Sequence, residues 1–144
     1  MPALMHNIST IYRCACAYRQ DALEEHGLRA GHASYLVAVC KTPGITQDQL
    51  AKRIFINKSN VARQLVFLEE AGFVERRPSP NDKRAILVYP TDKALEIYPQ
   101  IRQIFRDWES LVAQDLTPDE QEMMIAILSK MKARAAEWME ENMA

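Results

Sequence analysis

Four polar side chains between positions 59 and 64 have the donor and acceptor groups needed to recognise DNA bases: Ser59, Asn60, Arg63 and Gln64. In the major groove, arginine donates two hydrogen bonds to guanine, and the amides of asparagine and glutamine pair with adenine. An ordinary solvated helix face is dominated by Glu and Lys instead, whereas the first acidic residue after this group is Glu69. We therefore predict that this segment reads bases rather than simply facing solvent.

Helical periodicity gives the same segment one buried edge and one outward face. At about 100° per residue, the apolar edge consists of Val61, Leu65 and Leu68, and the outward face of Ser59, Asn60, Arg63, Val66 and Phe67, with Gln64 on the flank. Asn57, or else residues 58–59, can accept hydrogen bonds from the first free backbone N–H groups. Gly72 is the expected stop signal. A helix over residues 57–71 is therefore predicted, with the polar face turned outward.

A basic loop follows this helix. Two runs rich in β-branched and aromatic residues, Phe73–Arg77 and Ala85–Tyr89, are typical of short strands, and the polar segment 78–83 between them contains two prolines. The cations of this hairpin are Arg76, Arg77, Lys83 and Arg84. A cationic hairpin tip can enter a narrow minor groove or bind phosphates. We expect Asp82 and Arg84 on the same side of a strand, where Asp82 would hold an arginine in place.

A further short helix is predicted directly before the base-reading helix. Thr46 to Gln49 form a capping-box pattern that starts a helix ending near Ile54. Two adjacent short helices followed by a basic hairpin are the arrangement of a winged helix-turn-helix. The predicted DNA contacts are therefore Thr46, Gln47, Asn57, Lys58, Ser59, Asn60, Arg63, Gln64, Arg77, Asp82, Lys83 and Arg84.

The distribution of charge agrees with a nucleic-acid surface in the middle of the chain. The 144 residues carry a net charge of −1. The stretch from Lys41 to Arg84 holds nine bases and five acids, a net of +4, whereas the rest holds nine bases and fourteen acids, a net of −5. A basic middle between acidic flanks is expected when one surface of a nearly neutral protein binds nucleic acid.

The remaining elements are expected to be helices. Apolar residues at helical spacing predict helices over 4–26, ended by Gly27, and over 33–41, which is apolar on most sides and so buried. Thr91 is the expected cap of a helix to about residue 115, kinked near Pro99. A capping box at Thr117 starts the last helix, whose apolar stripe is Met124, Ile127, Leu128, Met131, Ala135 and Trp138. The predicted fold class is mainly α with a small β-hairpin wing.

Other classes of protein find little support. The longest apolar run, residues 35–40, is too short for a membrane span, and the first ten residues lack a secretion signal, so a cytoplasmic protein without a membrane partner is expected. Neither the three cysteines nor the three histidines have the spacing of a metal site. No phosphate loop or catalytic constellation is present, so neither an enzyme nor a cofactor is expected. Two alternatives remain: a regulator switched by oxidation of Cys14, Cys16 or Cys40, and a winged-helix interaction module without specific DNA binding.

The run from Gly44 to Ala94 resembles the MarR (multiple antibiotic resistance regulator) family of transcription regulators. The helix-turn-helix, the Asp82-Lys83-Arg84 motif and the following Thr91 match that family in order, and the likeness extends over nearly the whole chain. The resemblance implies a single MarR-type domain over 1–144, with a winged lobe at 42–90 and a helical dimerisation region at 1–41 and 91–144. It also implies a homodimer that binds a palindromic DNA site, as a ligand-responsive repressor.

A ligand site is predicted between the first helices and the long helix that starts after Thr91. Its candidate residues are Tyr12, Arg13, His32, Tyr35 and Trp108, with Tyr18 nearby. Aromatic rings together with one cation suit a small anionic aromatic effector. Packing of the same rings in a dimer core explains them equally well, because aromatic residues are frequent in such cores.

Overall fold

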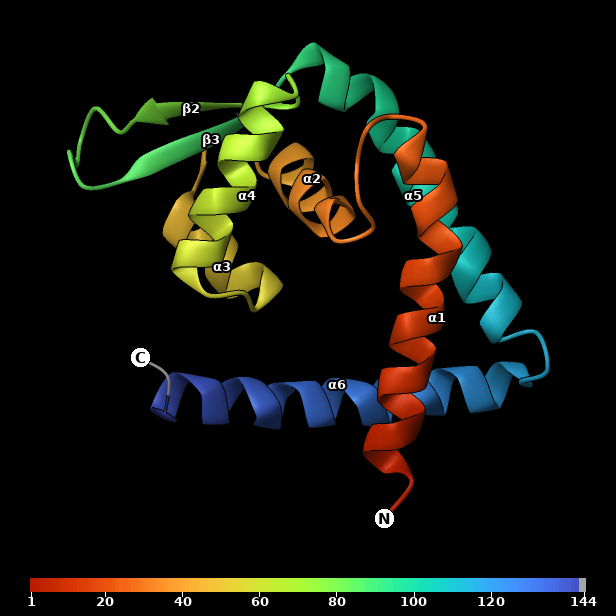
Figure 1. The fold of residues 1–144 in the computed structure, drawn as a ribbon. Coiled ribbons are helices and arrows are strands. Elements are labelled where there is room, and N and C mark those ends of the chain that lie inside the picture. The colour runs from red at the N-terminus through yellow and green to blue at the C-terminus, as the bar shows by residue number, and fades with distance from the viewer. Residues whose placement is uncertain (143–144) are drawn as a thin grey trace. The chain divides into compact units, whose positions relative to one another are not determined.

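The computed structural model describes residues 1–142 and consists of helices with one small sheet (Figure 1). The elements are α1 (Leu4–Glu24), α2 (His32–Lys41), β1 (Ile45–Thr46), α3 (Gln47–Ile54), α4 (Lys58–Glu70), β2 (Val74–Pro78), β3 (Ile86–Pro90), α5 (Asp92–Val112) and α6 (Pro118–Asn142). The chain forms two compact units, Met1–Trp108 and Glu109–Ala144. The predicted fold class is confirmed, and every predicted helix is present.

The sheet contains one strand that the sequence did not reveal. Its order is β1-β3-β2, with both pairings antiparallel. In β1, Ile45 lies opposite Val88 and Thr46 opposite Leu87. Two residues are too few to show the alternation by which strands are recognised, so β1 was missed. The two predicted strands exist, each displaced by one residue toward the C-terminus.

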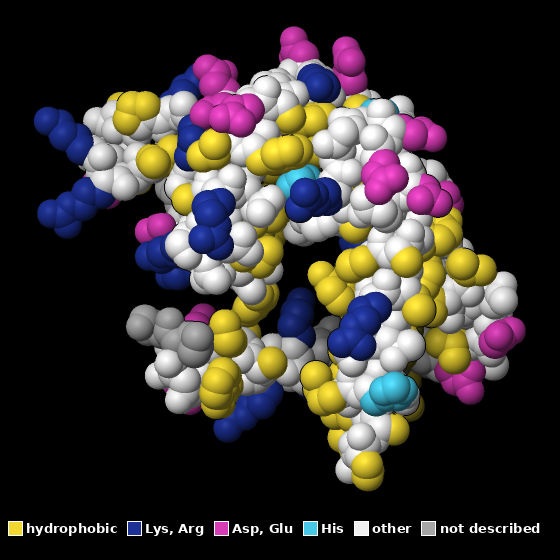
Figure 2. Space-filling view, viewed as in Figure 1, with side chains coloured by type: hydrophobic (Ala, Val, Ile, Leu, Met, Phe, Trp, Pro, Cys, Tyr) yellow, Lys and Arg dark blue, Asp and Glu magenta, His cyan; other side chains and the backbone are white. Residues whose placement is uncertain are grey.

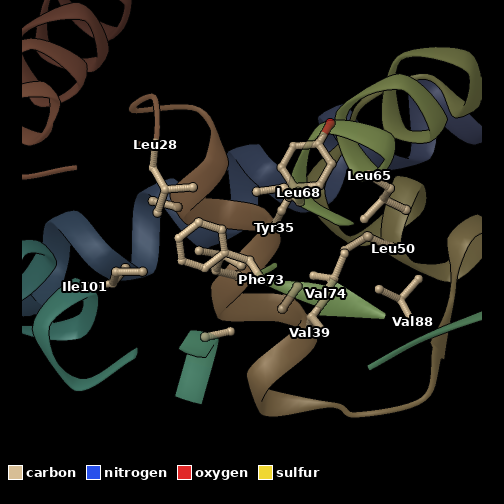
Figure 3. Close-up of a cluster of buried hydrophobic side chains, with 14 of the residues drawn as sticks. Leu28, Tyr35, Val39, Leu50, Leu65, Leu68, Phe73, Val74, Val88 and Ile101 are labelled. Carbon is tan, nitrogen blue, oxygen red and sulfur yellow. The ribbon is translucent and has the colours of Figure 1, made fainter. Parts of the chain in front are cut away.

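The core of the first unit lies between α2, α3, α4 and the sheet (Figure 3). Leu36 and Val39 of α2 are fully buried, as are Leu50 of α3 and Val88 of β3. The predicted apolar edge of α4 is confirmed, because Val61, Leu65 and Leu68 are each 0% exposed. Burying one face of α4 in this way fixes the direction of its opposite face.

Capping interactions set where the helices of the first unit start and stop. The predicted capping box of α3 is present, with Gln49 N–H donating to Thr46 Oγ1 over 3.0 Å and Thr46 N–H donating to Gln49 Oε1 over 3.1 Å. Asn57 caps α4, accepting at Oδ1 from Asn60 N–H over 2.8 Å. Gly72 follows α4 with φ +83°, a left-handed conformation that costs other residues energy. Both helices of the predicted pair therefore start where the sequence indicates.

The second unit contains the end of α5 and all of α6. Thr117 and Glu120 form the predicted capping box, with Thr117 N–H donating to Glu120 Oε2 over 2.8 Å and Glu120 N–H donating to Thr117 Oγ1 over 3.2 Å. No side chain of α6 is buried within this chain, although the helix carries Ile127, Leu128 and Trp138 at 50%, 44% and 57% exposure. Within residues 1–142, none of the helices is long and apolar enough to cross a membrane.

Candidate nucleic-acid interface

The outward face of α4 carries the residues predicted to read bases. Ser59 and Arg63 are exposed, and Asn60 and Gln64 are half-buried. Val66 and Phe67, each 41% exposed, continue this face along the helix. Arg63 belongs to no ion pair in the described part of the chain, so its guanidinium remains available to a base. The helix thus presents a cation and two amides next to an apolar strip.

The N-terminus of α4 is occupied by its own capping interactions. Ser59 Oγ donates to Asn57 Oδ1 over 2.9 Å, so the cap residue binds both this hydroxyl and the Asn60 N–H. Lys58 Nζ lies 3.3 Å from Asp48 Oδ2 of α3, and both side chains are about two-thirds exposed, at 69% and 68%. An ion pair this exposed contributes little to stability, and phosphate can displace it.

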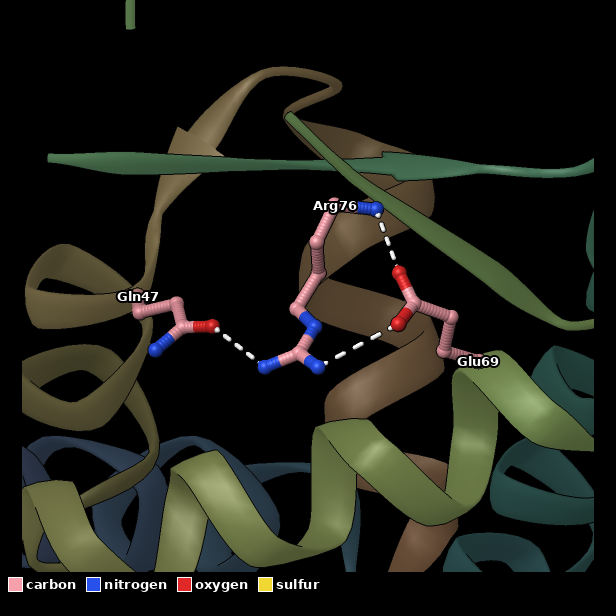
Figure 4. A network of polar contacts seen from close by, with 3 residues as sticks. All are labelled: Gln47, Glu69 and Arg76. Carbon is pink, nitrogen blue, oxygen red and sulfur yellow. Dashed lines mark hydrogen bonds and ion pairs between the residues drawn. The ribbon is translucent and has the colours of Figure 1, made fainter. Parts of the chain in front are cut away.

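A half-buried arginine connects the hairpin to both short helices (Figure 4). Arg76 of β2 donates from Nη2 to Glu69 Oε1 of α4 over 3.2 Å and from Nη1 to Gln47 Oε1 of α3 over 3.2 Å. Glu69 Oε2 also accepts from the Arg76 backbone N–H over 3.0 Å. These bonds from Arg76 lower the pKa of the Glu69 carboxyl below its ordinary value. We call Gln47, Glu69 and Arg76 the brace.

The brace was not found by sequence reasoning. In the sequence Arg76 is one of the cations of the predicted hairpin, and Glu69 is the first acidic residue after the base-reading group. Their opposite charges were visible, but a separation of seven residues across the turn at Gly72 corresponds to no helix or strand spacing. The brace also involves Gln47, a predicted DNA contact, whose side-chain oxygen is already bonded to Arg76.

The end of the hairpin carries Lys83 and Arg84, both exposed. One expectation about this tip was wrong: residues 82–85 form a turn instead of the start of a strand, closed by Ala85 N–H donating to Asp82 O over 3.1 Å. Asp82 Oδ1 accepts from the Arg84 backbone N–H over 2.9 Å, so the carboxylate fixes the backbone of the turn rather than an arginine side chain. Short acidic side chains commonly bond the backbone two residues ahead in turns.

Arg77 differs from the tip cations because it has partners within the hairpin. Its Nη2 lies 2.9 Å from Glu75 Oε2, and its guanidinium carbon lies 4.7 Å from the centre of the Tyr89 ring. The bond from Arg77 lowers the pKa of Glu75, and the same contact raises the pKa of Arg77. Figure 2 shows Lys and Arg side chains projecting at the left from the end of the hairpin, beyond the rest of the first unit.

The residues predicted to line a ligand site are distributed between core and surface. His32 and Tyr35 are 3% and 2% exposed, and Tyr35 belongs to the core cluster of the first unit. Tyr12 is 63% exposed and Arg13 is exposed. Trp108 contacts Tyr18 of α1, with ring centres 5.4 Å apart. Packing therefore accounts for His32 and Tyr35, and the five candidate residues do not share one environment.

The structure also bears on thiol chemistry and on metal binding. Cys14 is exposed, whereas Cys16 and Cys40 are half-buried, and all three are free thiols. Burial raises the pKa of Cys40 to about 11, which keeps it protonated and unreactive at neutral pH. Across residues 1–142, no group of His, Cys, Asp and Glu side chains is arranged to hold a metal ion.

Comparison with known proteins links this geometry to a family. The sequence profile of the MarR family matches residues 26–85. The helix-turn-helix transcriptional regulator YybA of Bacillus subtilis (strain 168) is 26% identical over 132 residues, which cover 92% of this chain and 88% of that protein. A crystal structure of MarR is 30% identical with a TM-score of 0.85, over 96% of this chain and 94% of that one. A MarR family regulator from Listeria monocytogenes, crystallised with 26mer DNA, is 26% identical with a TM-score of 0.88, over 92% of this chain and 89% of that one.

Proposed function

The chain belongs to the MarR family of transcription regulators, and on this premise we propose that it reads a specific DNA sequence through α4 and the β2–β3 hairpin. The proteins that it matches are transcription regulators, and this chain is likewise a winged-helix transcription regulator and not an enzyme. The observation that carries the proposal is the placement of three ionically unpaired cations, Arg63 on α4 and Lys83 and Arg84 at the hairpin tip. Among the described residues none of these three side chains has an ion-pair partner, so a duplex can approach them without breaking an ion pair.

In this proposal each part of the surface has its own task. Arg63 donates to a guanine, and Asn60 and Gln64 contact neighbouring bases in the major groove. Lys83 and Arg84 contact phosphates or the minor groove, where they add affinity but little sequence preference. Thr46 and Lys58, at the starts of the two short helices, and the remaining predicted contacts orient the lobe on the sugar-phosphate backbone.

We further propose that the protein acts as a homodimer. Apolar side chains are exposed along α1, where Met5 is 66% and Ile11 48% exposed, and along α6, where Met123 is 65% and Ile125 60% exposed. This much exposed apolar surface is typical of an interface between subunits. Two copies related by a twofold axis would place two recognition helices in successive major grooves, about 34–36 Å apart, on a palindromic operator.

The regulatory behaviour follows the family expectation. We propose a cytoplasmic repressor whose operator is released when a small anionic aromatic compound binds near Tyr12 and Trp108. Such a compound acts by binding the form of the dimer whose lobe spacing does not fit DNA. Its affinity for the DNA complex must then be lower than its affinity for the free protein, by the same factor by which the compound lowers the affinity for DNA. Calorimetric titration of salicylate into the free protein and into its DNA complex tests this, and equal affinities would contradict it.

The DNA-binding proposal is tested by electrophoretic mobility shift on the region upstream of the protein's own gene. Arg63→Lys is the matched control for Arg63→Ala, because lysine keeps the charge but lacks the planar fork that contacts two guanine acceptors. Both variants should weaken binding to the preferred site, by about 1–3 kcal/mol for alanine, and alanine alone should weaken binding to unrelated DNA. If wild-type protein shifts every duplex equally, it binds DNA without sequence preference. If it shifts no duplex, the interaction-module alternative is supported.

A further inference from the structure

His32 is buried at the start of α2, against the flank of the recognition helix α4. Its ring is stacked on the Phe67 ring, with centres 4.8 Å apart and planes 14° apart. Its Nε2 lies 2.8 Å from Oε1 of Gln64, and its Nδ1 lies 3.0 Å from the backbone nitrogen of Arg29. The histidine therefore contacts two residues of the outward half of α4 although it lies 32 positions away from Gln64 in sequence.

The hydrogen bonds determine which ring nitrogen carries the proton. The backbone N–H of Arg29 is a donor only, so Nδ1 must be the acceptor and therefore bears no hydrogen. In a neutral imidazole the hydrogen then resides on Nε2, which donates to Gln64. Burial, the largest cause, and the nearby Arg29 charge lower the pKa of His32, which keeps the ring neutral at pH 7. The side-chain oxygen of Gln64 is thus engaged by a fixed donor.

We propose that His32 is a positioning residue for DNA reading, because its bond to Oε1 of Gln64 directs the NH₂ group of that amide toward the major groove. A free glutamine side chain samples many rotamers, and ordering it on DNA costs affinity. With the oxygen held by His32, the amide offers donors to a base. It therefore favours the acceptor edges of guanine or thymine over the donor-and-acceptor pairing with adenine that an unrestrained glutamine makes.

The proposal rests on the proposed function, since it has meaning only if α4 reads bases. It adds a residue outside the DNA surface to the determinants of specificity, and it assigns His32 a task other than lining a ligand site. The other neighbours of the imidazole are Phe67, which is uncharged, and Arg29, which precedes α2. No acidic partner of His32 is present among residues 1–142, so Gln64 is its side-chain acceptor.

Two substitutions separate the two hydrogen bonds of His32. His32→Gln is long enough to donate an amide N–H near the position of Nε2, so it can keep the bond to Gln64 and lose the one from Arg29. His32→Asn reaches only the position of Nδ1, so it can keep the bond from Arg29 and lose the one to Gln64. His32→Phe keeps a ring on Phe67 and loses both bonds. Any general weakening of α2 should therefore affect His32→Gln at least as much as His32→Asn.

The experiment is selection of bound sequences from a duplex library with about 26 randomised base pairs, enough for two half-sites one helical turn apart, followed by sequencing. It compares wild type, these three variants and Gln64→Ala. Wild type should enrich a motif in which one base-pair position loses its preference in Gln64→Ala. At that position His32→Phe and His32→Asn should reduce the preference for the wild-type base over the other bases roughly fivefold and should enrich adenine instead. His32→Gln should retain the wild-type base.

The outcomes distinguish this inference from the function on which it rests. If wild type enriches no motif, the proposed function fails. If wild type does enrich a motif, two outcomes refute the positioning role. In one, Gln64→Ala changes the base preference at no position of the motif. In the other, His32→Phe and His32→Asn keep the wild-type base. Thermal unfolding of each variant identifies any that fail to fold. In that case the folded one of His32→Phe and His32→Asn still decides the question, because each of them removes the bond to Gln64.

Discussion

The brace should stabilise the first unit more than an exposed ion pair would, and Glu69→Gln tests this. The carboxylate of Glu69 accepts two hydrogen bonds from Arg76, at 3.0 and 3.2 Å, and the Arg76 side chain is only 22% exposed. A hydrogen bond to a charged group contributes about 1.5–3 kcal/mol when buried. Because the Glu69 side chain is 38% exposed, solvent screening reduces this. We expect a loss of about 1–2 kcal/mol in the free energy of unfolding.

The hairpin supplies a matched control. Glu75→Gln also removes the charge of a glutamate that binds a neighbouring arginine, but that pair is exposed at both ends, at 55% and 57%. Urea unfolding monitored by circular dichroism should show a lower midpoint for Glu69→Gln and no measurable change for Glu75→Gln. Equal midpoints in the two variants would refute the reasoning that burial and the backbone bond make the brace strong.

The same prediction has a pH dependence whose direction is fixed. Folding lowers the pKa of Glu69, so the unfolded chain binds a proton first as the solution is acidified. The contribution of the brace is complete above the pKa of the unfolded chain and is lost as the pH falls through the folded-state pKa. The difference between wild type and Glu69→Gln should therefore shrink below about pH 4. A difference that stays constant throughout the acidic range would show that the carboxylate charge is not the cause.

Three further outcomes are expected. Gly72→Ala should lower the free energy of unfolding by about 1 kcal/mol, measured by urea unfolding, because φ is +83° there while the new Cβ would meet only Lys93 Cδ, at 3.8 Å. Arg84→Ala should weaken binding to all DNA sequences alike and reduce the slope of log affinity against log salt by about 1, measured by fluorescence anisotropy. Light scattering at micromolar concentration should report a dimer, and a stable folded monomer of 16.5 kDa would contradict the proposed interface.

Periodic features of the fold could be predicted from the sequence, and isolated contacts could not. The apolar edge of α4 repeats at helical spacing, so the positions of Val61, Leu65 and Leu68 followed from periodicity alone. The caps at Thr46 and Asn57 were found because each acts on residues only three positions away. β1 was missed because its pairing with β3 joins segments about 40 residues apart, and two residues contain no pattern.

The candidate site shows the same limit at the level of side chains. The residue types on the outward face of α4 indicated base reading, and the hairpin tip was recognised by its charge. The partners of those side chains depend on tertiary packing, and packing joins Gln64 to His32 and Gln47 to Arg76. The sequence therefore did not show that His32 contacts Gln64, and it led us to expect Asp82 to hold an arginine where the carboxylate instead binds the Arg84 backbone.

These partners divide the basic residues into two groups that formal charge does not distinguish. Lys58, Arg76 and Arg77 each have a carboxylate within 3.3 Å, so binding a phosphate would require them to give up an existing bond. Arg63 and Arg84 have no ion-pair partner in the part of the chain that the structure describes, and they release only counterions and water when DNA binds. The net gain per contact is therefore larger for the second group. It follows that the salt dependence of binding should reflect the unpaired cations of α4 and the hairpin tip more than the paired ones, of which only the half-buried Arg76 also holds the hairpin to both short helices.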